Sequence, residues 1–569
     1  MESQPRIGVY ICHCGFNIAA TVDVEAVAEF ARHLPGVAIA RTYMYMCSEP
    51  GQSLIQKDIV EHGLKRVVVA SCSPRMHEPT FRKAAQTGGV NFGQVEMANI
   101  REQCSWVHKD RAEATEKAKA LVASAVAKAA YLEPLQERVV GVTPGAVVIG
   151  GGVAGLVAAL DVADAGFPTC LVEKSDHLGG RVTNLHRTFP DLEPVAAWLP
   201  ELIERVQAHP NITVHLNARV KNVEGYVGNF RVKVEARSEV EVKAGAIVVA
   251  TGYSPFDPTR TPELGYGQYP QVMTTMEMEK RLAESDPQKG TGGLTINGKT
   301  PKDIVFIKCV GSRDVQLGNP YCSRVCCMVS AKQARLLKEQ LPESRVTVFY
   351  TDVRTFGKRG EEFYDEVRKS GVLYRRGNVS EVYRKGERVV VRVEDTFLRR
   401  VIEHEADLVV LAVGMEARQD AGDVANLLKL ARSADGFFLE AHPKLRPVDT
   451  ATDGVFLAGT CQGPKDIPDT VAQAKAAAAS SLIPLLRGSV PVESATAVVD
   501  IELCAACGLC VETCPYGAPS IDPVWGASVV NAVLCKGCGT CAALCPSKAI
   551  RLQHFCPEAI LAQVDALVW

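Results

Sequence analysis

The chain has 569 residues, of which 63 are Lys or Arg and 65 are Asp or Glu, giving a formal net charge of -2. That balance argues against a strongly basic nucleic-acid binder, and the 47% hydrophobic content excludes a disordered chain. No apolar run reaches the ~18 residues of a membrane-spanning helix. The polar N-terminus shows no signal peptide, so we expect a cytoplasmic protein. The chain contains 20 cysteines, an unusually large number. Because disulfides are rare in the reducing cytoplasm, these cysteines favour metal or redox chemistry.

The cysteines fall into three groups that a cysteine-poor scaffold separates. Five lie before residue 105, four lie between residues 309 and 327, and nine lie after residue 503. A length of 569 residues suggests three or four domains at ~150 residues each. Each group of cysteines therefore defines a candidate metal-bearing region.

The first group lies in a region that alternates short apolar segments with helix-like ones. We expect strands at residues 7–12, 38–43 and 66–70, while residues 111–131 contain no Gly or Pro and predict a connecting helix. This alternation implies a parallel sheet, and ligands collect at the carboxyl ends of such strands. Cysteines near those ends could converge on a metal cluster, which needs four of the five: Cys12, Cys14, Cys47, Cys72 and Cys104. Their spacing does not decide which four.

A glycine-rich turn follows the first strand of the second region. Residues 146–155 contain an apolar strand, the pattern G-x-G-x-x-G and the start of an apolar helix. Gly150 permits the tight turn, Gly152 lets a pyrophosphate approach the backbone, and Gly155 allows close helix packing. Glu173 ends the next strand, where a carboxylate accepts from a ribose hydroxyl. The pattern predicts a dinucleotide site, with a bare structural turn as the alternative.

Later segments resemble the FAD domain of the two-dinucleotide-binding, thioredoxin-reductase-like flavoproteins. The likeness covers about residues 145–480, and it implies that a late helix directs its N-terminus at the flavin. The predicted FAD-binding residues are Gly150, Gly152, Val153, Ala154, Gly155, Glu173, Lys174, Gly180, Arg181, Ala250, Thr251, Gly252, Gly459, Thr460, Ala472 and Gln473. These flavoproteins usually place Asp after an Ala-Gly pair, where this chain has Thr460-Cys461.

The second nucleotide-binding half departs from the usual pattern. Its first strand, residues 304–309, leads into a segment with one glycine where a second glycine fingerprint is expected. Four thiols stand where a pyrophosphate would dock: Cys309, Cys322, Cys326 and Cys327. They suggest a metal cluster in place of a nicotinamide, with a redox-active disulfide or buried thiols as the alternative. Residues 257–300, rich in Gly, Pro and Thr, are expected to form an irregular insertion.

The C-terminal region repeats a run of four cysteines followed by proline, at an interval of about 31 residues. This is the bacterial ferredoxin pattern, in which the fourth cysteine of each run ligates the other cluster. One cluster is therefore predicted at Cys504, Cys507, Cys510 and Cys545, and the other at Cys514, Cys535, Cys538 and Cys541. A pair of zinc knuckles is the alternative. Cys556 is left over as a buried thiol.

The head motif at residues 9–18, the middle motif at residues 309–327 and the doubled tail together resemble the A-type component of heterodisulfide reductase. The resemblance spans the chain and assigns a cluster to the four middle cysteines. It implies an FAD- and iron–sulfur-containing oxidoreductase component that carries out flavin-based electron bifurcation or confurcation in a cytoplasmic complex. The implied partners are B- and C-like subunits, ferredoxin, and a hydrogenase-, formate dehydrogenase- or MvhD-like electron-input subunit, within a homodimer. The extra ferredoxin insert of methanogen forms is absent, because residues 257–300 contain no cysteine.

The predicted fold is a multidomain α/β protein. Residues 1–135 form a parallel α/β domain with one [4Fe-4S] cluster, residues 140–490 an FAD domain with the unusual cluster, and residues 495–569 a 2[4Fe-4S] ferredoxin domain. Lys332, five residues after Cys327, is the candidate catalytic residue, because a cation near the flavin or a cluster stabilises a reduced state.

Two other functions fit part of the sequence. A self-contained NAD(P)H-dependent flavin oxidoreductase could hold a nicotinamide phosphate with Arg354 and Lys358, although the second glycine fingerprint is missing. An architectural protein could use its clusters only to hold domains together. No nucleic acid and no membrane span are expected.

Overall fold

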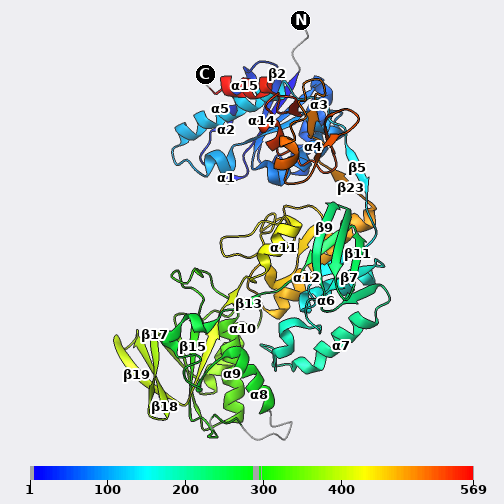
Figure 1. Cartoon of the computed structure of the whole chain (residues 1–569). Helices are drawn as coiled ribbons and strands as arrows, with labels where there is room; N and C mark the ends of the chain where they lie inside the picture. The colour runs from blue at the N-terminus through cyan, green and yellow to red at the C-terminus, as the bar shows by residue number, and fades with distance from the viewer. Residues whose placement is uncertain (1–5, 286–293, 297, 568–569) are drawn as a thin grey trace. The chain divides into compact units, whose positions relative to one another are not determined.

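The computed structural model describes residues 6–285, 294–296 and 298–567 (Figure 1). They form two compact units, Met1–Val140 with Pro491–Trp569, and Gly141–Val490. The first unit is thus discontinuous in sequence and combines the head and the tail, which the sequence suggested as separate domains. In the part of the chain that is described, no helix is both long and apolar enough to cross a bilayer.

The head is built on a four-stranded parallel sheet, as expected. Its strands run in the order β2 (Val37–Tyr43), β1 (Ile7–Cys12), β3 (Arg66–Ser71) and β4 (Val95–Asn99). Side chains alternate between the two faces of a strand. One face therefore packs on helices α2 (Val24–Arg32) and α5 (Arg111–Ala129), and the other on α3 (Glu49–His62) and α4 (Pro74–Thr87).

The tail packs on the head through its last helix, α15 (Pro557–Asp565), which contacts α5. His554 bonds the Glu133 carbonyl oxygen at 2.8 Å, and the Lys128 ammonium lies 4.4 Å from the centroid of the Phe555 ring. The rest of the tail is a two-fold repeat. Helix α13 (Leu509–Thr513) and hairpin β25–β26 (Pro519–Asp522, Ala527–Val530) are matched by α14 (Thr540–Leu544) and the pair β24–β27 (Ala497–Val499, Ile550–Leu552).

The second unit begins with a five-stranded parallel sheet. Its order is β22 (Val455–Leu457), β12 (Ala246–Val249), β6 (Ala146–Ile149), β7 (Thr169–Val172) and β8 (Ile212–His215). Helices α6 (Val153–Asp164) and α12 (Ile467–Arg487) cover one face. A three-stranded antiparallel sheet, β9–β11 (Arg219–Tyr226, Asn229–Glu235, Glu239–Ala244), covers the other.

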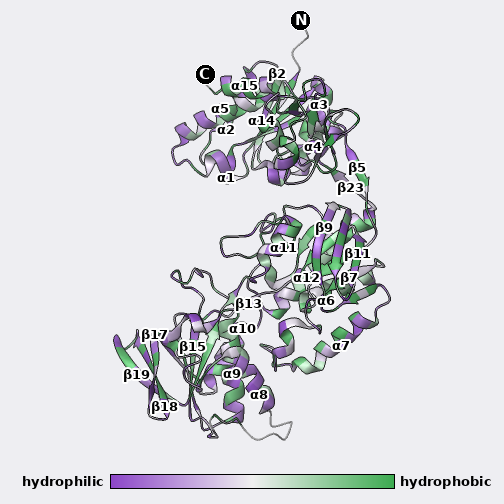
Figure 2. Cartoon of the chain, in the orientation of Figure 1, coloured by the Kyte–Doolittle hydropathy of each residue, from purple (hydrophilic) through white to green (hydrophobic). Residues whose placement is uncertain are grey.

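The other half of this unit has a seven-stranded sheet in the order β14-β20-β15-β16-β17-β18-β19. Strands β14 (Val272–Thr274), β20 (Leu408–Val413), β15 (Asp303–Val310), β16 (Arg345–Tyr350) and the start of β17 (Leu373–Lys385) are parallel. Strands β18 (Arg388–Asp395) and β19 (Arg400–Ala406) continue as an antiparallel meander. Helices α8 (Thr275–Glu284), α9 (Cys326–Gln340) and α10 (Gly360–Lys369) pack on one face, and α8 and α9 are striped hydrophilic and hydrophobic in Figure 2.

The expectation of an irregular insertion at 257–300 is wrong for its described residues. The segment supplies strand β14 and helix α8 to the second sheet. A capping box starts that helix, since the Thr274 hydroxyl accepts from the Glu277 N–H while the Glu277 carboxylate accepts from the Thr274 N–H. The high content of Gly, Pro and Thr in the segment favoured a loop prediction, although the capping-box residues Thr274 and Glu277 are visible in the sequence. Residues 286–293 and 297 of the segment lie outside the described residues.

Candidate functional site

A cavity of about 240 Å³ in the second unit opens at the glycine turn between β6 and α6. Gly150 has a φ of 112°, which favours glycine. A Cβ on Gly155 would lie 1.8 Å from the Gly150 carbonyl oxygen, so only glycine permits this close approach. Helix α6 begins at this cavity, where its free N–H groups provide an anion site. The turn therefore fits a pyrophosphate.

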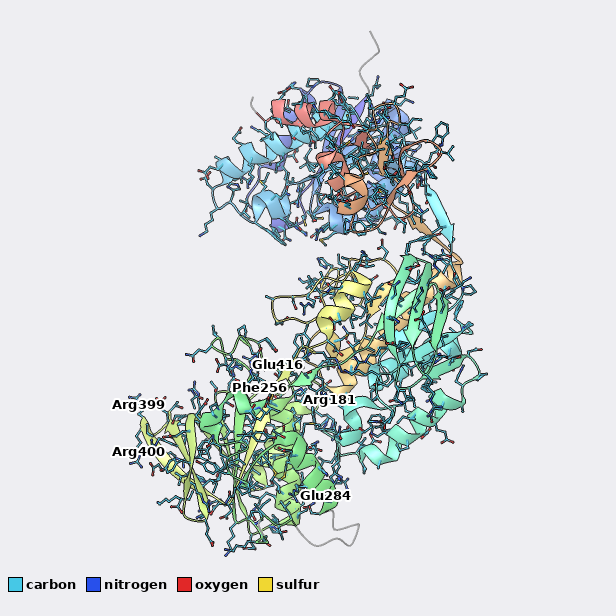
Figure 3. All side chains as sticks on the ribbon, in the orientation of Figure 1. Arg181, Phe256, Glu284, Arg399, Arg400 and Glu416 are labelled. Atoms are coloured by element: carbon cyan, nitrogen blue, oxygen red, sulfur yellow. The ribbon has the colours of Figure 1, made fainter. Side chains whose placement is uncertain are left out.

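Most of the predicted FAD-binding residues line this cavity: Gly150, Gly152, Val153, Ala154, Glu173, Gly180, Arg181, Ala250, Thr251, Gly252 and Thr460. Glu173 is held at the end of β7, where its carboxylate accepts from the N–H groups of Gly151 (2.6 Å) and Ser175 (2.8 Å). Arg181, labelled in Figure 3, donates to the Tyr253 carbonyl oxygen at 3.0 Å. These polar groups surround the glycine turn, which is the arrangement that a nucleotide site requires.

A second cavity, of about 260 Å³, shares Gly150, Glu173, Thr251 and Arg418 with the first. Lys174, predicted from the sequence, lines it together with residues 218–220 and helix α11 (Ala421–Leu428). Two cavities that meet at a phosphate-binding turn fit the two ends of a dinucleotide.

Arg418 was not predicted as a site residue. It contacts the Asp420 carboxylate at 2.6 Å and donates to the Thr251 carbonyl oxygen at 3.3 Å. Asp420 also pairs with Lys174 at 2.9 Å. Arg418 follows β20 and belongs to no motif, so only the folded chain brings it to the glycine turn.

The N-terminus of α12 forms another wall of the first cavity, since residues 465–468 and Thr470 line it. Asp466 caps this helix by accepting from the Asp469 N–H at 2.8 Å. The positive end of the helix dipole would stabilise negative charge on a bound cofactor. The sequence missed Lys465, which is buried and donates to the carbonyl oxygens of Gly459 (3.0 Å) and Gly463 (2.9 Å). Burial lowers the pKa of Lys465.

The other predicted residues of this loop shape it from outside the cavity lining. The Gln473 amide oxygen accepts from the Gly459 N–H at 2.8 Å, and Ala472 is on the same helix. Thr460 faces the cavity, whereas the buried Cys461 thiol donates to the Val249 carbonyl oxygen at 3.1 Å. Related flavoproteins usually have Asp at the position of the Thr460-Cys461 pair. In this chain, the Thr460 hydroxyl is the group of that pair that a ligand can reach.

Lys332 lines the same cavity from α9. It is 1% exposed, and its ammonium lies 2.7 Å from the Glu279 carboxylate and donates to the Arg187 carbonyl oxygen at 2.7 Å. Burial lowers the pKa of Lys332, and the Glu279 charge opposes that effect. Glu279 also accepts from the His186 N–H at 3.0 Å. The buried pair therefore links the second half of the unit to the FAD half.

The four middle thiols come together beside this cavity, and Cys326 lines it directly. Burial raises the pKa of Cys326, and the nearby thiols of Cys309, Cys327 and Cys322 raise it further. Cys326 and Cys327 open helix α9, so both residues lie at the positive end of the helix dipole. Cys309 has a φ of 62°, an uncommon conformation for a non-glycine residue. The thiols of Cys309, Cys322 and Cys327 all act on Cys326, and such a group at the start of a helix fits a metal cluster.

In the head, the structure separates the five cysteines into four and one. Burial raises the pKa of Cys12 and Cys47, with Cys14 contributing to both, and raises that of Cys72 to about 11, with Cys14 and Cys12 contributing. The Cys12 sulfur accepts from the N–H groups of Cys14 and Met46, each at 3.3 Å. Cys104 lies against α5, where its buried thiol donates to the Ala114 carbonyl oxygen at 3.1 Å.

Arg101, which belongs to no sequence motif, also reaches the thiols of the head. Its guanidinium donates to the Cys14 sulfur at 3.2 Å, and its charge lowers the pKa of Cys72 against the effect of burial. It comes from the short helix Arg101–Ser105 after β4, at the same sheet edge as the thiols. A cation and backbone amides directed at sulfur are the groups that stabilise a negatively charged cluster.

We expect Cys72→Ser to lose the head cluster, about four irons per chain, and Cys104→Ser to retain them. The reason is that Cys72 belongs to the convergent group, whereas the Cys104 thiol already has a carbonyl partner. Iron per chain after anaerobic purification measures the difference, with thermal unfolding as a check on folding. Equal iron loss in the two variants would contradict the assignment.

Two cavities in the tail are each lined by four cysteines. The first contains Cys504, Cys507, Cys510 and Cys545, and the second contains Cys514, Cys535, Cys538 and Cys541. These are the two predicted sets, in which the fourth cysteine of each run crosses to the other cavity. Backbone N–H groups point at the sulfurs, from Ser528 to Cys504 (3.3 Å) and from Ala518 to Cys514 (3.4 Å). The paired sets fit two cubane clusters.

Two known protein families match parts of the chain. The pyridine nucleotide-disulphide oxidoreductase family matches residues 145–479, and the 4Fe-4S dicluster domain matches residues 502–550. One of the iron-sulfur A subunits of CoB–CoM heterodisulfide reductase from Methanopyrus kandleri is 46% identical over 599 residues, covering 91% of each chain. The A subunit of H(2):CoB-CoM heterodisulfide,ferredoxin reductase from Methanothermobacter marburgensis is 46% identical over 643 residues, covering 99% of this chain and 97% of its own.

Among solved structures, thioredoxin reductase from T. acidophilum matches 61% of this chain and 99% of its own, with 15% identity and a TM-score of 0.41. The matching families identify a flavoprotein domain and a [4Fe-4S] domain within one oxidoreductase. Together with near full-length relatives at 46% identity, they show that the chain belongs to the family of heterodisulfide reductase A subunits.

Proposed function

We propose that the chain is the electron-splitting subunit of a heterodisulfide reductase-like complex, with one FAD and four [4Fe-4S] clusters. The observation that carries this proposal is the position of Cys326, which lines the same cavity as the FAD fingerprint and belongs to the group of four middle thiols. A cluster at these thiols would lie beside the flavin site, where the related reductases have a second nucleotide-binding fingerprint.

The cavity residues divide into groups that would hold different parts of FAD. The glycine turn and α6 would bind the pyrophosphate, Glu173 the ribose, and residues 218–220 with Lys174 the adenine end. Thr460, the N-terminus of α12 and Lys332 would face the flavin end. FAD, when bound, exchanges electrons singly or in pairs. In this assignment Glu279 positions Lys332, whose charge favours a reduced cofactor.

The clusters are assigned by thiol grouping. The head cluster would use Cys12, Cys14, Cys47 and Cys72, the middle cluster Cys309, Cys322, Cys326 and Cys327, and the tail clusters the two crossed sets. Amide N–H groups, Arg101 and burial would set their potentials. The chain's own part is to hold these centres and to tune them.

The proposed partners follow from what the relatives' names state. The M. marburgensis relative is named for H(2), CoB-CoM heterodisulfide and ferredoxin, and one from Methanococcus maripaludis is also named for formate. We infer B- and C-like subunits that handle a disulfide-type acceptor, ferredoxin as the low-potential acceptor, and a hydrogenase-, formate dehydrogenase- or MvhD-like subunit that delivers electrons. Two copies of the chain would form the core of the complex.

Anaerobic purification with iron and flavin analysis tests the cofactor content. We expect about sixteen irons and one FAD per chain, from four cubane clusters and one flavin site. About eight irons would confine the clusters to the tail and contradict the head and middle assignments. In the full complex, ferredoxin should be reduced only while the disulfide-type acceptor is also present. Ferredoxin reduction without that acceptor would contradict electron splitting.

The alternative of an NAD(P)H-dependent oxidoreductase receives less support from the described residues. Arg354 lies 3.5 Å from the Asp352 carboxylate, which also pairs with Arg313 at 2.5 Å, so these side chains already have partners. Reduction of the purified chain by NADH or NADPH would favour this alternative.

A further inference from the structure

A buried lysine next to the middle thiols lacks the oxygen partner that a buried ammonium needs. Lys308 precedes Cys309 on β15 and is 8% exposed. Within the described ranges, its Nζ has no hydrogen-bond partner. Its Nζ lies 5.3 Å from the centroid of the Tyr374 ring. Removing an ammonium from water has a large free-energy cost unless an anion or several dipoles compensate.

The other buried lysines of the described chain show how this cost is usually met. Lys332 pairs with Glu279 at 2.7 Å, and Lys128 pairs with Glu96 at 2.9 Å. Lys465 donates to three oxygen atoms of its own loop. Among these four, Lys308 alone has no such partner in the described residues. The negative charge that stabilises its ammonium must therefore come from a group other than a protein oxygen atom.

The middle thiols are the candidates for that charge. Ile304 and Phe306 of β15 face the core under α9, and Tyr374, whose ring lies near Lys308 Nζ, packs on the same core. Lys308 therefore lies on the face of the sheet where α9 begins with Cys326 and Cys327. Lys308 directly precedes Cys309, one of the four thiols, and both lie near the end of the buried strand β15. The Tyr374 hydroxyl is buried there too, with no hydrogen-bond partner among the described residues.

We propose that Lys308 is the counter-charge of the metal cluster held by Cys309, Cys322, Cys326 and Cys327, and that it favours the reduced state of that cluster. The inference rests on the proposed function, because it requires the middle cluster. A [4Fe-4S] cluster with four thiolates is already anionic, and accepting one electron adds one negative charge. A fixed ammonium in a buried setting stabilises the more negative state by the larger amount. Lys308 therefore acts on the cluster and is not a ligand of it.

The test is a redox titration of the anaerobic holoenzyme with dithionite, which supplies single electrons, followed by electron paramagnetic resonance. The signal of the middle cluster is the one that Cys327→Ser removes or shifts. We expect Lys308→Gln to lower the reduced-to-oxidised ratio of this cluster at least tenfold at a fixed potential, a shift of 59 mV for one electron. Lys308→Met, which needs no hydrogen bond, should do the same if the glutamine variant fails to fold.

Two variants serve as controls. Lys308→Arg keeps the charge, so its reduced-to-oxidised ratio should stay within about threefold of the wild-type ratio. In free energy, a threefold change is less than half of a tenfold change. Lys302→Gln removes an exposed charge from the start of the same sheet region and should leave the ratio unchanged. Loss of the cluster in both neutral variants but not in Lys308→Arg would also support the counter-charge.

The outcomes separate this inference from the proposed function. If wild-type protein lacks a signal that Cys327→Ser alters, the middle cluster does not exist and both fail. If the signal is present and both neutral variants stay within about threefold of wild type, Lys308 is not the counter-charge, whereas the proposed function stands. Cluster loss in all three Lys308 variants would show a need for lysine's shape and overturn the role of its charge.

Discussion

Cys545→Ser is expected to remove the cluster of the first tail cavity, although Cys545 lies in the second cysteine run. The chain should lose about four of its irons, because serine is a poor replacement for a thiolate ligand. The reason lies in the crossing of the two runs, which places Cys545 with Cys504, Cys507 and Cys510. Iron analysis and electron paramagnetic resonance would measure the loss.

Double variants make this test decisive. Cys541→Ser/Cys545→Ser changes two neighbours in one run that line different cavities, so about eight irons should be lost. Cys510→Ser/Cys545→Ser changes two residues of one cavity, and about four should be lost. If each run held its own cluster, these two results would be exchanged. Cys556→Ser, outside both cavities, is the matched control and should retain all the iron.

Gly155→Ala should abolish FAD binding while leaving the tail clusters in place. The added Cβ would lie 1.8 Å from the Gly150 carbonyl oxygen, so α6 must move away from the turn that its N-terminus completes. We expect less than about a tenth of the wild-type flavin per chain, a loss of more than ~1.4 kcal/mol in binding free energy. Flavin released by denaturation measures the content.

Two comparisons show whether that loss is local. Gly141→Ala adds a Cβ with no atom within 4 Å and should keep wild-type flavin. The head and tail clusters lie in the first unit, so their roughly twelve irons should be retained in Gly155→Ala. Full flavin retention in Gly155→Ala would show that the turn does not hold the dinucleotide.

Motifs with fixed local spacing made part of the site predictable. The glycine turn, Glu173 and the two tail runs depend on neighbours in sequence, and the structure places them around three cavities. In the head, the sequence predicts only that the five cysteines lie near one edge of the sheet. Which four converge depends on the path of the chain after β4. There the backbone turns through residues 101–105 and buries Cys104 against α5.

Residues that reach the site from distant segments could not be predicted. Arg418, Lys465 and Arg101 carry no motif, and each acts through contacts that exist only after folding. The grouping of the head with the tail likewise depends on packing between α5 and α15, more than 400 residues apart. Helix α8 is a different case, since its capping box is visible at Thr274 and Glu277 and was obscured by the surrounding composition.

The discontinuity of the first unit has a consequence for synthesis on the ribosome. The flavin-binding unit is contiguous and is complete at Val490, before any tail cysteine has been made. The head emerges first, yet the α5 surface gains its partner only when α15, at Pro557–Asp565, is translated. Domains fold as units while the chain grows. The flavin unit can therefore mature first, and the oldest part of the nascent chain is the last to finish its packing.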